Sequence, residues 1–164
     1  MSEESANTRA KKDAEHGKSP STQAGEFVRE EIHHVREGVH GARSARHAIA
    51  IGLSKARRAG VKLPPPKRGR ASSAVVRQAR RDLAKARARR SVSRRRSQAT
   101  LGALRRESRS TASHRQLAAQ ARSSARRRGP AARHHASIKA VRTKGPLGLR
   151  RAARKAAATR RKSK

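Results

Sequence analysis

The sequence contains no cysteine, tryptophan or tyrosine, and its only aromatic residue apart from histidine is Phe27. Without cysteine the chain can form neither disulfides nor thiolate zinc sites. Leu, Ile, Val and Phe account for only 21 of the 164 residues. This share, about 13%, is below the roughly 20% under which a highly charged chain is expected to be disordered. We therefore expect that the chain does not bury an apolar core along its whole length.

Acidic residues are scarce after residue 37. Eight of the ten Asp and Glu residues lie in residues 1–37, which carry a formal charge of −2. Residues 38–164 hold 39 Lys and Arg against only Asp82 and Glu107, a formal charge of +37. Such a field attracts a polyanion. General acid–base or metal-dependent catalysis needs carboxylates, and residues 38–164 contain only two. The glycines are isolated, so the sequence shows no Gly-rich loop that would hold the phosphates of a substrate. The sequence therefore predicts a nucleic-acid-binding protein and not an enzyme.

Membrane association is not expected either. No apolar run approaches the roughly 20 residues of a membrane-spanning helix, and the N-terminus is polar, unlike a secretory signal. The basic segments also lack the Trp, Phe and Leu face that anchors amphipathic helices at a membrane surface. These features predict a cytoplasmic, nucleoid-associated protein with no membrane partner.

The apolar residues that are present gather in residues 27–63, which hold ten of the 21. Val28, Ile32 and Val35 repeat at i, i+4 and i+7, which predicts a helix over residues 26–37 that Gly38 ends. Since the glutamates of its early turns complement the helix dipole, the charge pattern agrees with this assignment.

A second helix is predicted from Ser44, its N-cap, to Gly60, which suits the left-handed position after a helix. Ile49 and Leu53 mark its apolar face, and the three prolines of residues 64–66 stop it. Together the two helices form a small helical hairpin over residues 24–63. Its core is small enough that a homodimer through residues 26–60, or bound nucleic acid, would be needed to stabilise it.

The remaining segments are expected to be irregular. Residues 1–23 are predicted to be a disordered polar arm, residues 64–72 a linker rich in proline and basic residues, and residues 73–164 a polybasic, Ala/Arg-rich nucleic-acid-binding region. The predicted fold is thus mostly α with extensive disorder: a small helical hairpin followed by a long, intermittently helical basic region.

Three helices are predicted within that basic region. Ser73 can cap one that runs to Arg89, and Ser113 with Gln116 has capping-box spacing for one that Gly129–Pro130 would end. The third covers residues 147–161. Because their like charges repel and they have little to bury, these helices should fluctuate until phosphates neutralise the arginines.

Residues 25–63 read GEFVREEIHHVREGVHGARSARHAIAIGLSKARRAGVKL and resemble a family of small bacterial basic proteins often named plasmid-stabilisation or histone-like proteins. The similarity centres on AIAIGLSKARRAG, residues 48–60. It implies a folded core and association with DNA, and it supplies no catalytic residue. The final residues, 145–164, are similar to the Ala/Lys/Arg-rich tails of linker-histone-like proteins.

The segment Pro66-Lys67-Arg68-Gly69-Arg70 resembles an AT-hook, in which Arg-Gly-Arg lies extended along a narrow minor groove. Ala71 stands where a hook usually has a second proline. A plain basic linker is the alternative interpretation.

Arginine clusters are the candidate phosphate contacts, because a guanidinium binds phosphate in a bidentate manner. No aromatic residue follows Phe27 to stack on unpaired bases, and contacts to the backbone carry no sequence information. We therefore expect non-sequence-specific binding to the backbone of duplex DNA. The candidate nucleic-acid-binding residues are Lys67, Arg68, Arg70, Arg77, Arg80, Arg81, Arg94, Arg95, Arg96, Arg126, Arg127, Arg128, Arg150, Arg151, Arg160, Arg161 and Lys162.

Four of the eight histidines, His33, His34, His40 and His47, lie within 15 residues. Adjacent His33 and His34 should point to different sides of a helix, and no cysteine or His-Glu-x-x-His motif accompanies them. We expect surface or pH-responsive histidines, with no metal and no cofactor.

Three functions remain open from the sequence. The first is a nucleoid-associated, histone-like protein that neutralises and compacts duplex DNA and aids plasmid or chromosome maintenance. The second is an RNA- or ribosome-associated protein whose basic arm recognises the shape of folded RNA. The third is an adaptor whose hairpin binds a protein partner while the arm localises it.

Overall fold

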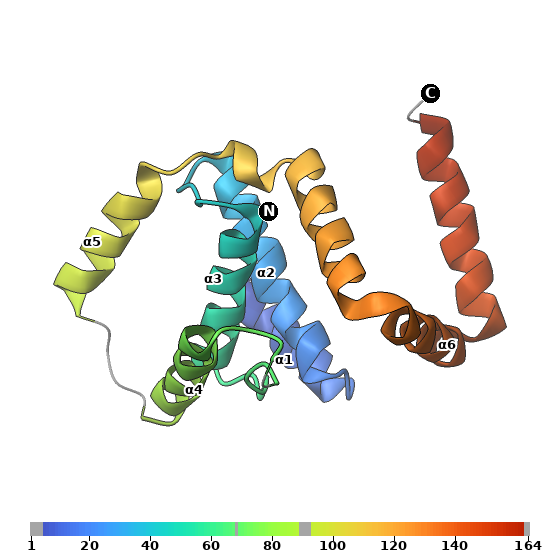
Figure 1. The fold of residues 1–164 in the computed structure, drawn as a ribbon, viewed down its shortest axis with the longest axis horizontal. Coiled ribbons are helices and arrows are strands. Elements are labelled where there is room, and N and C mark those ends of the chain that lie inside the picture. Colours follow the sequence, from blue (N-terminus) through green and yellow to red (C-terminus); the bar gives the residue numbers. More distant parts are fainter. Residues whose placement is uncertain (1–4, 68, 89–92, 163–164) are drawn as a thin grey trace. The chain divides into compact units, whose positions relative to one another are not determined.

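The protein is described here by a computed structural model, which covers residues 5–67, 69–88 and 93–162 (Figure 1); the side chains of Arg87 and Lys162 are left undescribed. In these ranges the chain forms six α helices and one 3-10 turn: α1 (Ala6–Glu15), α2 (Pro20–Glu37), α3 (Ala45–Arg58), α4 (Ser73–Ala88), α5 (Arg94–Arg105), η1 (Ser110–Ala112) and α6 (His114–Lys162). The prediction of extensive disorder around a small hairpin is therefore wrong. The chain is all-α and divides into two units, residues 1–120 and 121–164.

Within residues 5–23, α1 and the first turn of α2 replace the disordered arm that was predicted for residues 1–23; residues 1–4 lie outside the described residues. Ser5 caps α1 by accepting a hydrogen bond from the backbone N–H of Thr8. Ala6 and Ala10 are buried against α2. Because Arg9 pairs with Glu26 of α2 at 2.7 Å, polar contacts supplement a very small apolar face.

Helices α2 and α3 confirm the ends that local signals predicted, except that α2 begins earlier. Ser19 caps α2 and Pro20 occupies its first turn, six residues before the predicted start. Gly38 ends α2 in the left-handed region at φ +81°. Ser44 caps α3 through the backbone N–H of His47, and Gly60 follows α3 at φ +99°.

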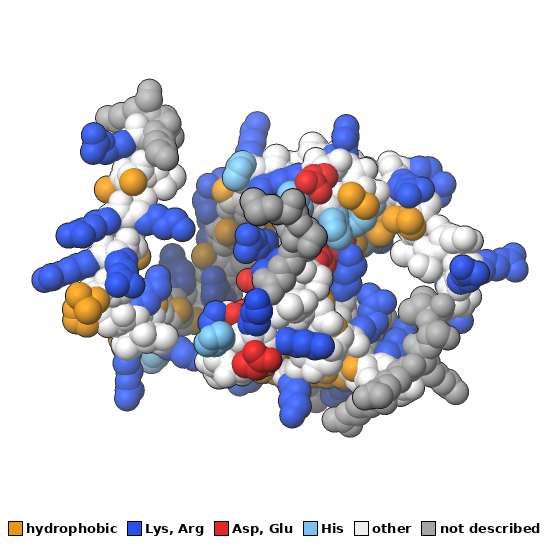
Figure 2. All heavy atoms as spheres, turned by 180° about the vertical axis from the view of Figure 1, so that it is seen from behind, with side chains coloured by type: hydrophobic (Ala, Val, Ile, Leu, Met, Phe, Trp, Pro, Cys, Tyr) orange, Lys and Arg blue, Asp and Glu red, His pale blue; other side chains and the backbone are white. Residues whose placement is uncertain are grey.

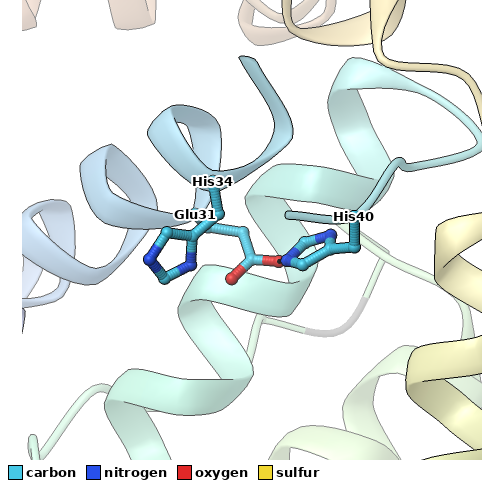
Figure 3. A group of neighbouring side chains, drawn as sticks. All are labelled: Glu31, His34 and His40. Carbon is cyan, nitrogen blue, oxygen red and sulfur yellow. Dashed lines mark ion pairs between the residues drawn. The ribbon is translucent and has the colours of Figure 1, made fainter. Parts of the chain in front are cut away.

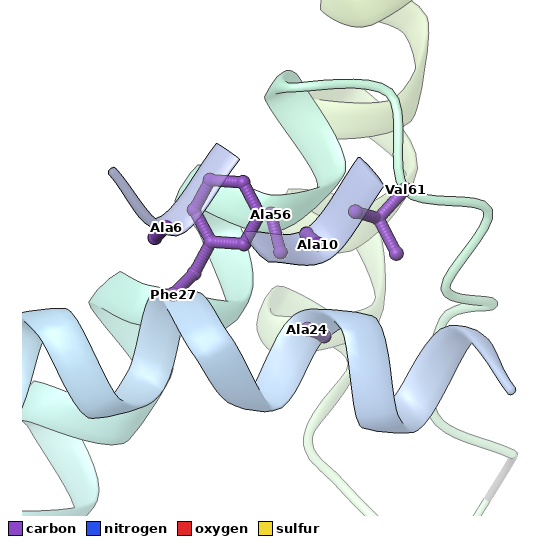
Figure 4. Packing of buried hydrophobic residues seen from close by; sticks show 6 residues of the cluster. All are labelled: Ala6, Ala10, Ala24, Phe27, Ala56 and Val61. Atoms are coloured by element: carbon purple, nitrogen blue, oxygen red, sulfur yellow. The ribbon is translucent and has the colours of Figure 1, made fainter. Parts of the chain in front are cut away.

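The first apolar cluster lies where α1, α2 and α3 meet (Figure 4). Phe27 of α2 lies against Ala6 and Ala10 of α1 and Ala56 of α3. Alanines make up most of this cluster, so the helix backbones approach closely. The α2 and α3 backbones approach closely at Gly52 of α3, where an added Cβ would lie 2.7 Å from the Cα of Val28.

The second cluster lies at the other end of α2 and α3. It contains Val35, Ala42 and Ala48, with Ala112 of η1. The chain reaches it again at the end of α5 and just after it, because the backbone N–H of Gly41 donates to the carbonyl of Leu104 at 2.8 Å and that of Ala42 donates to the carbonyl of Ser108 at 3.2 Å. Residues 104–112 are therefore part of the helical bundle and not of a free basic arm.

Helix α4 also packs on the bundle, through α3. It begins at the predicted Ser73. The capping side chain is that of Ser72, however, which accepts a hydrogen bond from the backbone N–H of Val75. Its predicted last residue, Arg89, lies outside the described residues. Ala79 and Asp82 are buried, and Asp82 accepts a 2.6 Å hydrogen bond from Ser54 of α3. Packing thus holds α4 without phosphate.

Helix α6 is interrupted twice. Ser113 caps its start through the N–H of Gln116, as predicted. Gly129 and Gly145 have non-helical backbone angles, and each precedes a proline. The predicted stop at Gly129–Pro130 is therefore a break after which the helix resumes. None of the described helices combines the length and apolar character needed to cross a membrane.

Candidate nucleic-acid interface

The two acidic residues of the basic region both face the bundle. Asp82 is 1% exposed and accepts hydrogen bonds from Ser54 and Gln78. Glu107 is half-buried and lies 3.9 Å from Arg43 of the α2–α3 connection. The sequence has 33 Lys and Arg after residue 63, and the structure buries or half-buries the two acidic side chains among them, Asp82 and Glu107. Figure 2 shows the result on one face, where Lys and Arg are numerous and Asp and Glu few.

Arg77, Arg80 and Arg81 lie on the exposed side of α4. Because the opposite side carries the buried Ala79 and Asp82, packing on α3 turns these arginines toward solvent. Arg77 and Arg80 also line a groove of about 410 Å³ together with Pro66 and Ala71 of the preceding linker. The structure thus brings the linker and α4 together, as parts of one basic surface.

The linker itself differs from an extended hook. Lys67 and Arg70 are exposed, and Arg68 lies outside the described residues. The N–H of Arg70 donates to the carbonyl of Lys67 at 3.0 Å, and Gly69 has a φ of +80°. The backbone turns here, so binding as an AT-hook would require this turn to open.

Hydrogen bonds from α3 hold the start of the linker in place. Arg57 of α3 donates hydrogen bonds from its guanidinium to the carbonyls of Leu63 and Pro64. Burial lowers the pKa of Arg57 from its usual value, and nearby Asp82 opposes that shift. These hydrogen bonds hold the first residues of the linker against α3.

The other candidate residues lie on α5 and α6. Arg94, Arg95 and Arg96 form the exposed first turn of α5. On α6, Arg126, Arg127 and Arg128 precede the first break, and Arg150, Arg151, Arg160 and Arg161 follow the second; all are exposed. The side chain of Lys162 is outside the described part. Arg127 donates to Ser123 and Ser124 one turn earlier.

Residues 121–164 form a unit with 16 Lys and Arg and no acidic residue. An α helix rises about 1.5 Å per residue, so a positive charge recurs about every 4 Å along these helical segments. Duplex DNA carries one phosphate per about 1.7 Å of its axis. The spacing allows many of these cations to reach a phosphate.

Several ion pairs within the bundle involve cations that are not candidate residues. Acids pair there with Arg9, Lys18, Arg29, Arg43, Lys55 and Arg58, and with His33 and His40. These cations stabilise the bundle and are not among those proposed to bind phosphate.

The structure also assembles one group that the sequence analysis missed. Glu31 and His34 of α2 lie beside His40 of the following connection, and Figure 3 shows the Glu31 carboxylate between the two imidazole rings. Glu31 is fully buried and His40 is 6% exposed. The available signals were the Glu31–His34 spacing, which puts both on one helix face, and the chain reversal at Gly38.

Residues 17–68, about a third of the chain, match a family described as a family of unknown function (DUF6496). The match includes α2, α3 and the start of the linker, and it stops before α4. No curated protein and no solved structure matches the chain. The resemblance inferred from residues 25–63 is therefore supported only as a similarity to this family. A plasmid-stabilisation or histone-like identity is not supported by the match.

Proposed function

We propose that the protein binds the phosphate backbone of duplex DNA without sequence specificity and compacts it, as a nucleoid-associated, histone-like protein. Residues 5–63 form most of a folded bundle, and the exposed cations of α4, α5 and α6 contact phosphates. A role in plasmid or chromosome maintenance and a location in the nucleoid belong to the same proposal. So does pairing of two copies through residues 26–60.

The observation that carries the proposal is that Asp82 is buried and Glu107 is half-buried beside Arg43. A basic protein whose acids are interspersed on its surface neutralises itself, and its net field is weakened. Here Asp82 is 1% exposed and Glu107 contacts the bundle, so the surface after residue 63 retains its positive charge. Electrostatic attraction to phosphate is the sequence-independent part of DNA binding.

Helix α4 offers the best-defined part of this interface. Arg77, Arg80 and Arg81 are spaced at i, i+3 and i+4, which places them on one face of a helix that α3 holds rigid. Since their orientation is set by packing, these side chains lose less freedom on binding than residues of a disordered arm would.

The test is fluorescence anisotropy on labelled duplex DNA over a salt series. The variant Arg77→Gln/Arg80→Gln/Arg81→Gln should lower the slope of log affinity against log salt by up to about 2.7, at about 0.9 per phosphate contact. The matched control is Lys11→Gln/Arg46→Gln/Lys62→Gln, which removes three exposed cations of the bundle. Equal loss in the two variants would contradict a defined α4 interface.

Competition with unlabelled folded RNA separates the proposal from RNA recognition. Duplex DNA should compete at least as well as RNA at matched phosphate concentration. If RNA competes more than tenfold better, the protein belongs with RNA- or ribosome-associated proteins instead.

A further inference from the structure

We propose that Glu31, His34 and His40 form a binding site for a divalent transition-metal ion of the zinc type. The three side chains offer one carboxylate oxygen and two imidazole nitrogens, and these ligand atoms lie within 4.8 Å of one another. Two histidines with one carboxylate, leaving a fourth position open, is an established zinc ligand set.

The orientation of His40 is the first supporting observation. Its Nδ1 lies 3.0 Å from the carbonyl oxygen of Gly41, and only a protonated nitrogen can donate to a carbonyl. Nδ1 therefore carries hydrogen, and Nε2 faces Glu31. Metal-binding histidines are commonly oriented in this way, by a hydrogen bond from the second ring nitrogen to a backbone carbonyl.

The contact between His40 and Glu31 is the second observation. Nε2 of His40 lies 3.2 Å from Oε1 of Glu31. A lone pair on each atom would repel the other, so either a proton, carried by Nε2 or by Oε1, or a metal ion lies between them. Two ligands bound at about 2.1 Å to a tetrahedral ion lie about 3.4 Å apart. The observed separation is thus close to what a shared zinc ion requires.

Burial of Glu31 is the third observation. Its side chain is fully buried, and within the described residues neither carboxylate oxygen has a hydrogen bond of good geometry. The ammonium of Lys55 contacts Oε2, which leaves Oε1 to face His40. Lys55 supplies one positive charge to this buried carboxylate, and a divalent ion bound to Oε1 would add a second on the side that faces His40.

His34 completes the site with a small movement. It is half-buried and lies on the same face of α2 as Glu31, one turn later. Its ring is 6.1 Å from that of His40 and nearly perpendicular to it. A rotation of its side chain brings the third ligand to the ion. A bound ion would join the α2–α3 connection to α2, next to the contact between Gly41 and Leu104.

Zinc titration against a chromophoric indicator tests the site on the full chain, after treatment with a chelator. We expect one equivalent of tightly bound zinc, separate from weaker binding by surface histidines. His34→Gln should weaken the tight class at least tenfold. His33→Gln is the matched control, because His33 is the residue of α2 directly before His34 and contacts Glu37 at 2.9 Å instead. Equal affinities in the two variants would overturn the proposal.

Two further measurements test the same site by other readouts. Cobalt should give the intense visible absorption of a tetrahedral site in the unmodified chain and in His33→Gln, but not in His34→Gln. Lys55→Gln should raise zinc affinity about tenfold or more, because it removes a positive charge beside the ion. Unchanged zinc affinity in Lys55→Gln, or only weak octahedral cobalt absorption in the unmodified chain, would refute the site.

Discussion

Replacing Gly52 with alanine tests the close helix packing on which the bundle depends. Gly52 lies in the middle of α3, and a Cβ added there would lie 2.7 Å from the Cα of Val28 and 3.0 Å from the carbonyl oxygen of Phe27. Carbon atoms pack best about 3.5–4.0 Å apart, so α2 and α3 would have to separate locally by about 1 Å. These are backbone atoms of α2, which cannot rotate away as a flexible side chain does.

The expected loss follows from two opposing effects. Overpacking a well-packed interior costs about 1–3 kcal/mol, and the upper end applies where the obstacle is backbone. Alanine regains about 1 kcal/mol over glycine within a helix. Gly52→Ala should therefore lower the free energy of unfolding by about 2 kcal/mol. Gly102→Ala in α5 is the control: a Cβ there meets nothing within 4 Å, so it should stabilise by about 0.5–1 kcal/mol.

Urea unfolding followed by far-ultraviolet circular dichroism measures both variants, since the chain has no Trp or Tyr for fluorescence. With a urea dependence of about 2 kcal/mol per M, the midpoint of Gly52→Ala should fall by about 1 M. A midpoint equal to or above that of the unmodified chain, with Gly102→Ala stabilised as expected, would refute the close approach of α2 and α3.

Two further substitutions test other contacts of the bundle. Gly41→Ala should detach the segment after α5, because its Cβ would lie 1.8 Å from the carbonyl oxygen of Glu107; faster amide hydrogen exchange at Gly41 and Ala42 would report this, and unchanged protection would contradict it. Asp82→Ala should destabilise by about 1–3 kcal/mol in thermal unfolding, because it leaves the hydroxyl of Ser54 without its buried acceptor; a fully retained melting temperature would show that this contact contributes nothing.

The helix ends of α2 and α3 were predictable because their signals are local. Gly38 and Gly60 adopt the left-handed conformation that only glycine tolerates readily, and Ser44 bonds within its own first turn. Such signals need no knowledge of the rest of the chain. The prediction of the two central helices therefore succeeded where the overall fold class failed.

Helix α1 was missed because its contacts are long-range and mostly not apolar. It buries two alanines, which count little in a search for apolar periodicity. Arg9 pairs with Glu26, and the carboxylate of Glu30 accepts from the backbone N–H of Ala6 at 2.9 Å. These partners are 17 and 24 residues away in sequence, so local spacing did not reveal them. The low content of large apolar residues led to the prediction of disorder, but alanine packing and polar contacts stabilise the bundle.

The candidate interface was predictable in composition but not in arrangement. The sequence showed that Asp82 stands among arginines, yet its burial depends on Ser54, 28 residues earlier. Ala79 and Leu83 are four residues apart, which puts them on one side of the predicted helix. This spacing does not reveal that α3 packs against Ala79 and Asp82, which is why the basic region was predicted to fluctuate.

The segregation of charge along the sequence has a structural reason. Glu26, Glu30 and Glu31 of α2 each contact another helix or the connection after α2, and Asp13 binds Lys18 between α1 and α2. These four acids thus serve folding, which a core built largely of alanine could not sustain by apolar burial alone. An acid on the outer face of α4 or α6 would serve no such contact and would cancel the attraction to phosphate. The same physical demand, a small core beside a strongly cationic surface, accounts both for the placement of these four carboxylates before residue 38 and for the burial of Asp82 after it.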